Sequence, residues 1–201
     1  MEHDVDDIDA WARTAPEVPA QWFLEPDRAH GIHGAGHIRR VYVLAERLTR
    51  ELGSDETARR RVLTAALWHD IGRTHDGVEP EHGARSVTRA VELGLVDELT
   101  SADVAVVLFA IRFHSLDDET GGAAASDGQE EDPLLALLLP HPLPLPPPDP
   151  VAALQTLWLL KDADALDRIR LGLGDDCDPS YLRFERSRKL IGFAQRLYRN
   201  A

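Results

Sequence analysis

The chain has 201 residues, of which 43% are apolar, an ordinary fraction for a folded protein with a sizeable core. Its 35 acidic residues outnumber its 22 lysines and arginines, which gives a formal net charge of −13. A surface of this charge repels polyanions and argues against a nucleic-acid polymer as the main partner. It is compatible with a small phosphorylated substrate, because a metal and a few arginines can invert the field inside a cleft.

Three further features argue against other classes of protein. The single cysteine, Cys177, cannot form an internal disulfide framework. The acidic stretch MEHDVDDIDAW lacks the apolar segment of a secretory signal. The longest apolar run, residues 134–139, is far too short to span a membrane. Together these features predict a cytoplasmic enzyme or binding protein that has no membrane partner.

Apolar residues recur at helical spacing along most of the chain, which predicts an all-α fold. Residues 1–30 are expected to form an arm that packs, partly as helix, on a domain spanning residues 31–201. No strand pattern or internal repeat interrupts this domain. It would contain about six main helices, over the approximate ranges 36–52, 55–69, 82–94, 101–114, 151–167 and 179–197.

Residues 115–150 differ in character from the rest of the domain. The stretch DDETGGAAASDGQEED is small, polar and acidic, a composition typical of disorder. Eight of the 13 prolines then lie between Pro133 and Pro150, where they prevent helix formation. We therefore expect a flexible insertion loop over 115–150, without stable helix in its acidic half. Such a loop could close over a cleft as a lid.

The most informative local signal is the pair His69-Asp70, in the string ALWHDIGR at the end of a predicted helix. The pair offers an imidazole nitrogen and a carboxylate oxygen. Adjacent side chains diverge by about 100° on a regular helix, but at a helix end both can turn toward one ion. His69 continues the apolar stripe of Val62 and Ala66, so its ring should point inward. The alternative is a helix-ending histidine followed by a solvated aspartate.

Asp164 lies in line with the apolar residues Leu157 and Leu160 of another predicted helix. A carboxylate buried there needs a cationic partner, which could be a metal or the nearby Arg168 or Arg170. A third inward-facing ligand type, His37, opens the first predicted helix of the domain. Ligands on three separate helices are typical of a metal site in a helical bundle.

The order of His37, His69-Asp70 and Asp164 resembles the HD-domain superfamily of metal-dependent phosphohydrolases, whose defining pattern is H…HD…D. The resemblance extends to neighbouring residues and covers roughly residues 33–170. HIRRV at 37–41 is similar to the family's first motif, ALWHDIGR to its second and KDADALDR to its third.

The resemblance implies an all-α bundle that holds one or two divalent transition-metal ions, of Mn, Fe, Co, Ni or Zn. The implied ligands are His37, His69, Asp70 and Asp164. The implied activity is hydrolysis of a small phosphate ester, a phosphodiester or a nucleotide, by a metal-activated water.

Two further histidines, His82 and His114, stand where several HD subgroups carry additional histidines. There they complete a second metal site or bind phosphate. The alternative is a pair of ordinary helix-end histidines. Because only twelve positions separate Asp70 from His82, we expect phosphate binding or protonation of the leaving group rather than a second ion.

Other residues are weaker candidates for the reaction. His33 and His37 reproduce the HGxxH spacing of phosphodiesterase-like members, so His33 is either catalytic or a hydrogen-bond partner. Arg73 could neutralise phosphate charge, as could Lys161, for which a surface ion pair is the favoured alternative. In many HD nucleotidases a glutamate takes the position of Arg73, which argues against that activity here. The weakest general-acid candidates are Asp76 and Glu79.

Two other functions compete with phosphate hydrolysis. A di-iron oxygenase of the HD type would use six ligands, and iron content and oxygen consumption would reveal it. The six candidates are His37, His69, Asp70, His82, His114 and Asp164. A non-catalytic nucleotide-binding module would be expected to have broken ligand motifs, and those of this chain are intact.

Overall fold

The computed structural model describes residues 7–126, 146–172 and 177–200. These residues form nine α-helices and four short 3-10 helices, and no strand occurs among them, which confirms the all-α prediction. The α-helices are α1 (Ile8–Ala12), α2 (Ala35–Glu51), α3 (Glu56–Trp68), α4 (His82–Glu92), α5 (Ser101–Phe113), α6 (Asp118–Ser126), α8 (Pro150–Leu166), α9 (Glu185–Lys189) and α10 (Ile191–Arg199). The 3-10 helices are η1 (Ala20–Trp22), η2 (Pro26–His30), η3 (Asp167–Leu171) and η4 (Pro179–Tyr181).

Side-chain caps define the starts of the main helices. Asp55, Thr100 and Asp149 each accept a hydrogen bond from a backbone N–H in the first turn of α3, α5 and α8 respectively. Pro150 occupies the first turn of α8, where its missing N–H costs nothing. After the C-terminal end of α2, Gly53 adopts a φ of 65°, a left-handed conformation that ends the helix.

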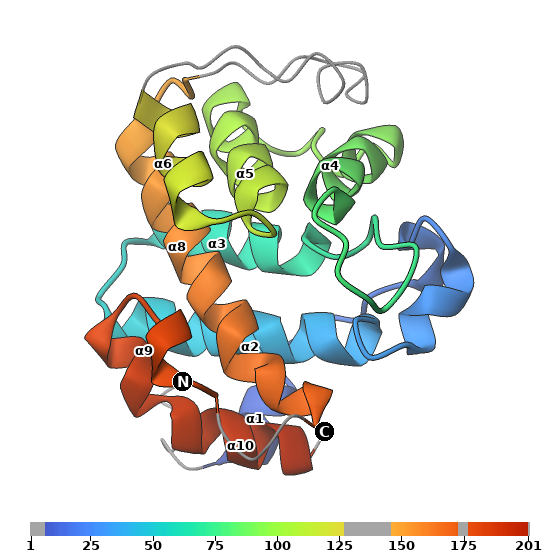
Figure 1. Cartoon of the computed structure of the whole chain (residues 1–201), viewed down its shortest axis with the longest axis vertical. Helices are drawn as coiled ribbons and strands as arrows, with labels where there is room; N and C mark the ends of the chain where they lie inside the picture. The colour runs from blue at the N-terminus through green and yellow to red at the C-terminus, as the bar shows by residue number, and fades with distance from the viewer. Residues whose placement is uncertain (1–6, 127–145, 173–176, 201) are drawn as a thin grey trace.

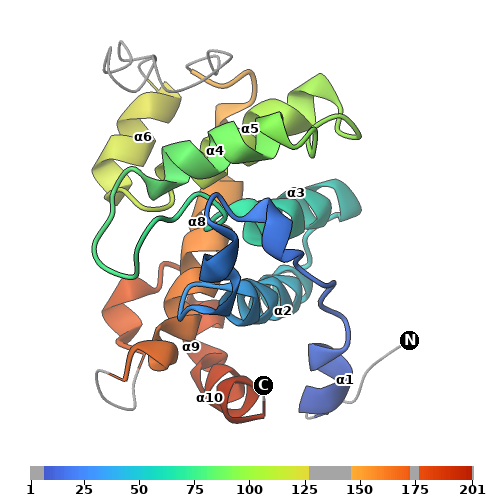
Figure 2. The ribbon, with the colours of Figure 1, turned by 90° about the vertical axis from the view of Figure 1, so that its right-hand side faces the viewer.

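The helices stack in layers around α8. Helix α2 packs against α3 and α8, while α5 packs against α3, α4 and α8. Figure 1 shows α8 crossing α3 and α2 obliquely, and Figure 2 shows α5, α3, α2 and α10 lying one beneath another. Fully buried side chains of α2, α5 and α8 fill the space between the layers, among them Ile38, Leu44, Phe109, Leu157 and Leu160. None of the helices in the described ranges is long and apolar enough to cross a membrane.

Residues 7–30 contact the bundle at several points. Trp11 and Phe23 are buried, and the backbone N–H of Leu24 donates to the carbonyl of Ile71 at 2.8 Å. Arg89 of α4 donates to two backbone carbonyls of the arm. The division of the chain into an arm at 1–30 and a domain from 31 stays a prediction.

The expectation that the acidic half of 115–150 has no stable helix is wrong, because residues 118–126 form α6. Asp117 accepts a hydrogen bond from the N–H of Thr120 at 2.7 Å and so starts the helix. The small residues that indicated disorder let α6 approach α8 closely. A Cβ added at Gly121 would lie 2.8 Å from the side chain of Leu157, and Ala124 and Ala125 are buried. The rest of the predicted loop, residues 127–145, lies outside the described residues.

The single last helix predicted over 179–197 is also wrong, since the structure divides it into η4, α9 and α10. The cause is Asp162, a fully buried residue of α8. Its carboxylate accepts hydrogen bonds of 3.0 Å from the backbone N–H groups of Arg183 and Phe184. Leu182 and Phe184 adopt extended backbone, with ψ angles of 127° and 138°, so this segment cannot continue as a helix.

Candidate metal centre

The six candidate ligand residues meet where the ends of five helices converge. His37 lies in the first turn of α2, and His69 is the C-cap of α3 with Asp70 directly after it. His82 begins α4 and His114 is the C-cap of α5. The rings of the histidines follow one another edge to face, with centroids 5.1 Å apart for His37 and His69, 5.1 Å for His69 and His114, and 4.7 Å for His114 and His82.

Each of these histidines turns the same nitrogen toward the centre. Nδ1 of His69 donates to the carbonyl of Ala66 at 2.8 Å, and Nδ1 of His82 and of His114 donates to a carbonyl three residues earlier, at 2.5 and 2.6 Å. Nδ1 of His37 donates to the carboxylate of Asp167 at 2.8 Å. Since Nδ1 holds the proton in each neutral ring, all four Nε2 atoms present a lone pair inward.

The inward lone pairs lie close to one another in two pairs. Nε2 of His37 lies 3.1 Å from Nε2 of His69, and Nε2 of His82 lies 2.8 Å from Nε2 of His114. Two lone pairs at these distances repel each other unless a proton or a metal ion lies near them. The arrangement therefore calls for a cation at each pair.

Asp70 lies between the two histidine pairs. Its Oδ2 is 3.4 Å from Nε2 of His37 and 3.8 Å from Nε2 of His69. Its other oxygen, Oδ1, is 2.9 Å from Nε2 of His82 and 3.5 Å from Nε2 of His114. One carboxylate thus offers a separate oxygen to each pair, which is the geometry of a ligand that can bridge two ions.

Asp164, in the last turn of α8, completes the group around His37. Its Oδ1 lies 3.3 Å from Nε2 of His37. This oxygen is buried and has no hydrogen-bond partner among the described residues. Nη2 of Arg170 lies 3.5 Å from the same oxygen. The alternative partners predicted for Asp164 were a metal or an arginine, and the structure places both a ligand cluster and Arg170 beside it.

These donors fit a metal by their chemistry. Three sets of ligand atoms lie within 4.8 Å of one another: His33, His37 and Asp70; His37, His69 and Asp164; and His69, Asp70 and His114. Imidazole nitrogens combined with carboxylate oxygens suit Mn, Fe, Co, Ni or Zn. The orphaned oxygen of Asp164 and the facing lone pairs are the features that a bound divalent ion would satisfy.

The electrostatics of the centre attract a positive charge, either a proton or a metal ion, to Nε2 of His37 and keep the ring of His69 neutral. Burial and Arg170 lower the pKa of His37, but the nearby carboxylates of Asp164, Asp167 and Asp70 outweigh them and raise it to about 9. Burial lowers the pKa of His69 to about 3, which keeps that ring neutral. Although burial raises the pKa of Asp70, the surrounding histidines lower it well below its usual value. The carboxylate is therefore charged.

Two arginines and His33 surround the ligand cluster. Nε of Arg73 lies 3.1 Å from Oδ2 of Asp70. Nδ1 of His33 lies 3.2 Å from the same oxygen and 3.1 Å from Nη2 of Arg170. Sequence reasoning proposed Arg73 and His33 as site residues, but considered Arg170 only as an ion-pair partner of Asp164.

The other weak candidates are occupied elsewhere. Lys161 forms a 2.6 Å ion pair with Asp118, as its alternative interpretation predicted. Glu79 accepts hydrogen bonds from Thr74 and pairs with Arg85. Asp76 pairs with Arg28 at the surface.

Glycines set the close packing that brings α4 to the centre. A Cβ at Gly83, next to His82, would lie 2.6 Å from the carbonyl oxygens of Ile111 and Arg112, just before His114. A Cβ at Gly72, two residues after Asp70, would lie 2.2 Å from the backbone nitrogen of Ser86. Only glycine permits these approaches.

Asp167 is a supporting residue that sequence reasoning missed. Besides His37, it binds Arg40, whose Nε and Nη2 donate to its two oxygens at 2.7 and 3.0 Å. A signal for it was present in the sequence. His37 and Arg40 are three residues apart on one helix face, as are Asp164 and Asp167.

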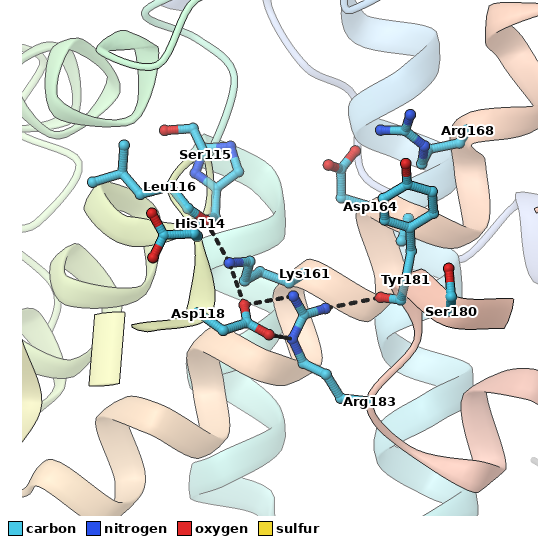
Figure 3. Close-up of a pocket in the computed structure, with 12 residues that line it drawn as sticks. His114, Ser115, Leu116, Asp118, Lys161, Asp164, Arg168, Ser180, Tyr181 and Arg183 are labelled. Atoms are coloured by element: carbon cyan, nitrogen blue, oxygen red, sulfur yellow. Dashed lines mark hydrogen bonds and ion pairs between the residues drawn. The ribbon is translucent and has the colours of Figure 1, made fainter. Parts of the chain in front are cut away.

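A cavity of about 510 Å³ opens beside the centre (Figure 3). His114 and Asp164 both line it, so it reaches the surroundings of both histidine pairs. The remaining walls are built largely of polar and charged side chains, among them Asp118, Lys161, Arg168, Ser180, Tyr181 and Arg183. A cavity of this size suits a small organic molecule.

The fold is an all-helical bundle, and its helix ends bring pairs of imidazoles together with carboxylates. This combination is typical of helical proteins that bind metal ions. The HD domain family model matches residues 34–169, which is more than half of the chain. The chain therefore belongs to the HD domain family, a superfamily of metal-dependent phosphohydrolases, as its motifs predicted. No curated protein and no solved structure matches it significantly.

Proposed function

We propose that the chain is a metal-dependent phosphohydrolase that would hold two divalent transition-metal ions, with Asp70 offering one oxygen to each. His37, His69 and Asp164 would complete the ligands of the first ion, and His82 and His114 those of the second. The observation that carries the proposal is that each oxygen of Asp70 faces its own pair of Nε2 atoms.

The second ion replaces the expectation of phosphate binding by His82 and His114. That expectation rested on the short spacing between Asp70 and His82. The spacing is no obstacle to contact, since Nε2 of His82 lies 2.9 Å from Oδ1 of Asp70. The mutual distance of 2.8 Å between His82 and His114 favours a shared cation over two separate phosphate contacts.

The substrate would be a small phosphate ester, either a phosphodiester or a nucleotide. When bound, the ions would supply an activated water and withdraw charge from phosphorus. Arg73 and Arg170, beside Asp70 and Asp164, can donate charge-assisted hydrogen bonds to phosphate oxygens. His33, next to both Asp70 and Arg170, can contact the leaving oxygen and hold a proton there.

The same six ligands would serve a di-iron oxygenase, so this is the second candidate. The arginines favour phosphate hydrolysis, because Arg73, Arg168 and Arg170 lie at the centre and its cavity and suit an anionic substrate. A non-catalytic nucleotide-binding module gains no support from a complete ligand cluster.

The test is metal analysis combined with a substrate panel. The protein is stripped of metal, reloaded with Mn²⁺, Co²⁺, Ni²⁺ or Mg²⁺, and offered phosphomonoesters, phosphodiesters and nucleotides. We expect metal-dependent phosphate release that Asp70→Asn abolishes together with metal binding, while the exposed Asp97→Asn retains both. Unchanged metal content in Asp70→Asn would overturn the assignment of the centre. Oxygen consumption by the iron-loaded protein, with no phosphate release from any ester, would support the oxygenase instead.

A further inference from the structure

The cavity beside the metal centre has walls of two origins. His114 and Asp164 belong to the segment that matches the HD domain, whereas Ser180, Tyr181 and Arg183 lie beyond its end at residue 169. In Figure 3 His114, Leu116 and Asp118 lie on one side of the cavity, and Asp164, Arg168 and Tyr181 lie on the other. The C-terminal segment therefore supplies part of the surface that would contact the organic portion of a substrate.

Among the described residues, three cationic side chains line this cavity, and two of them are already paired with carboxylates. Lys161 and Arg183 both pair with the carboxylate of Asp118 at 2.6 Å. Arg183 also pairs with the buried Asp162 at 3.1 Å. These two cations therefore serve chiefly to join α6, α8 and the C-terminal segment.

Arg168 differs from the other two cations. Among the described residues no carboxylate pairs with it, and its guanidinium carbon lies 4.6 Å from the ring centroid of Tyr181. Stacking on an aromatic ring fixes a guanidinium plane without using its N–H donors. Arg168 therefore presents an oriented positive charge whose hydrogen-bonding edge is available to a ligand in the cavity.

We propose that Arg168, held in place by Tyr181, binds a second anionic group of the substrate. The preferred substrate would then be a small organic molecule with two phosphate groups, one at the metal centre and one at Arg168. Asp164 and Arg168 are four positions apart and both line the cavity, so the two groups would lie on the same wall. The inference rests on the proposed function only in placing the first phosphate at the metals.

The test compares the binding of matched monophosphates and bisphosphates to the Mn²⁺-loaded protein by calorimetry. The probe pairs are fructose 6-phosphate with fructose 1,6-bisphosphate, and adenosine 5′-monophosphate with adenosine 3′,5′-bisphosphate. Because extra charge alone can strengthen binding, the quantity of interest is the bisphosphate-to-monophosphate affinity ratio in each variant. Arg186→Gln, an exposed arginine on α9, is the matched control.

We expect Arg168→Gln to lower the affinity for at least one bisphosphate by about tenfold or more, which is the loss of a charge-assisted hydrogen bond. Monophosphate affinity should change less than about twofold, within the range of surface substitutions. Tyr181→Phe should preserve the ratio, and Tyr181→Leu should reduce it, because only the phenyl ring retains the stack. Thermal melting of each variant checks that the fold is intact.

Three outcomes would overturn the inference: an equal loss for both members of each pair, an unchanged ratio in Arg168→Gln, or no binding of either bisphosphate to the wild-type protein. Failure of the proposed function looks different. In that case no ester is hydrolysed, yet Arg168→Gln still changes the affinity ratio.

Discussion

Nδ1 of His37 and Oδ2 of Asp167 are joined by a 2.8 Å hydrogen bond across 130 positions of the sequence. The bond fixes which nitrogen of His37 faces the centre. Arg40 binds the same carboxylate and holds it in place. The first and last parts of the HD match thus meet at one imidazole ring.

Asp167→Asn should lower the affinity for metal by about tenfold to a hundredfold, the usual effect of losing a carboxylate that supports a histidine ligand. The introduced amide can donate its NH₂ group to Nδ1 of His37. The ring proton then moves to Nε2, the nitrogen that would bind the metal. Titration of stripped protein with Mn²⁺ measures the effect, with Asp97→Asn as the control. An affinity equal to that of the wild type would mean that Asp167 only packs against the helix.

Replacing His82 or His114 with alanine should remove the second ion and retain the first. Metal analysis should then find about one ion per chain, since each substitution deletes a ligand from one pair only. His30→Ala, at an exposed histidine of η2, should retain the full complement. If both variants keep the wild-type metal content but bind inorganic phosphate more weakly, these histidines bind phosphate instead.

Gly83→Ala should destabilise the fold by about 1–3 kcal/mol, the cost of overpacking. Its Cβ would lie 2.6 Å from two carbonyl oxygens, so α4 must move away from α5 and carry His82 with it. The matched substitution is Gly122→Ala in α6, where a Cβ meets nothing within 4 Å. That change should stabilise the helix by up to about 1 kcal/mol. Urea unfolding of the two variants would show opposite shifts, and shifts of the same sign would contradict the packing argument.

The ion pairs of Asp118 should give the fold an acid-sensitive contribution to stability. Burial raises the pKa of Asp118, but Arg183 and Lys161 outweigh it and hold the pKa below its ordinary value of 3.8. The contribution is therefore fully present above pH 3.8 and is lost as the pH falls through the lowered value. Asp118→Asn should melt at a lower temperature than the wild type at pH 6, and the gap should narrow on acidification below pH 3.8. A gap independent of pH would show that the side chain acts through packing alone.

The sequence predicted the all-α bundle well because the helices depend on local periodicity, and the same periodicity predicted which candidate ligands face inward. The stripe of Val62 and Ala66 places His69 inward, and that of Leu157 and Leu160 does the same for Asp164. If the acidic half of 115–150 lacked stable helix, it would be dispensable for stability. The packing of Ala124 and Ala125 now predicts that losing α6 destabilises the protein.

Two kinds of feature could not be predicted locally. The alanines and glycines of α6 form a helix only because α8 offers a surface that small residues fit, and composition alone does not reveal that surface. The break after η4 depends on Asp162, which lies 21 positions before the backbone it captures. The close contact of His82 with Asp70 likewise depends on glycines that pack α4 against other elements.

The capture of Arg183 and Phe184 by Asp162 has a consequence for how selectivity could be altered. The ligand cluster and the C-terminal wall of the cavity occupy separate stretches of the chain, and Asp162 is a buried anchor between them. A transplanted C-terminal segment that keeps these backbone contacts could bring in a different wall while every ligand stays in place. The architecture is in this sense modular: a chimera made by exchange after residue 172 would keep the ligand cluster and Arg168 of one parent and take Tyr181 and the rest of the C-terminal wall from the other.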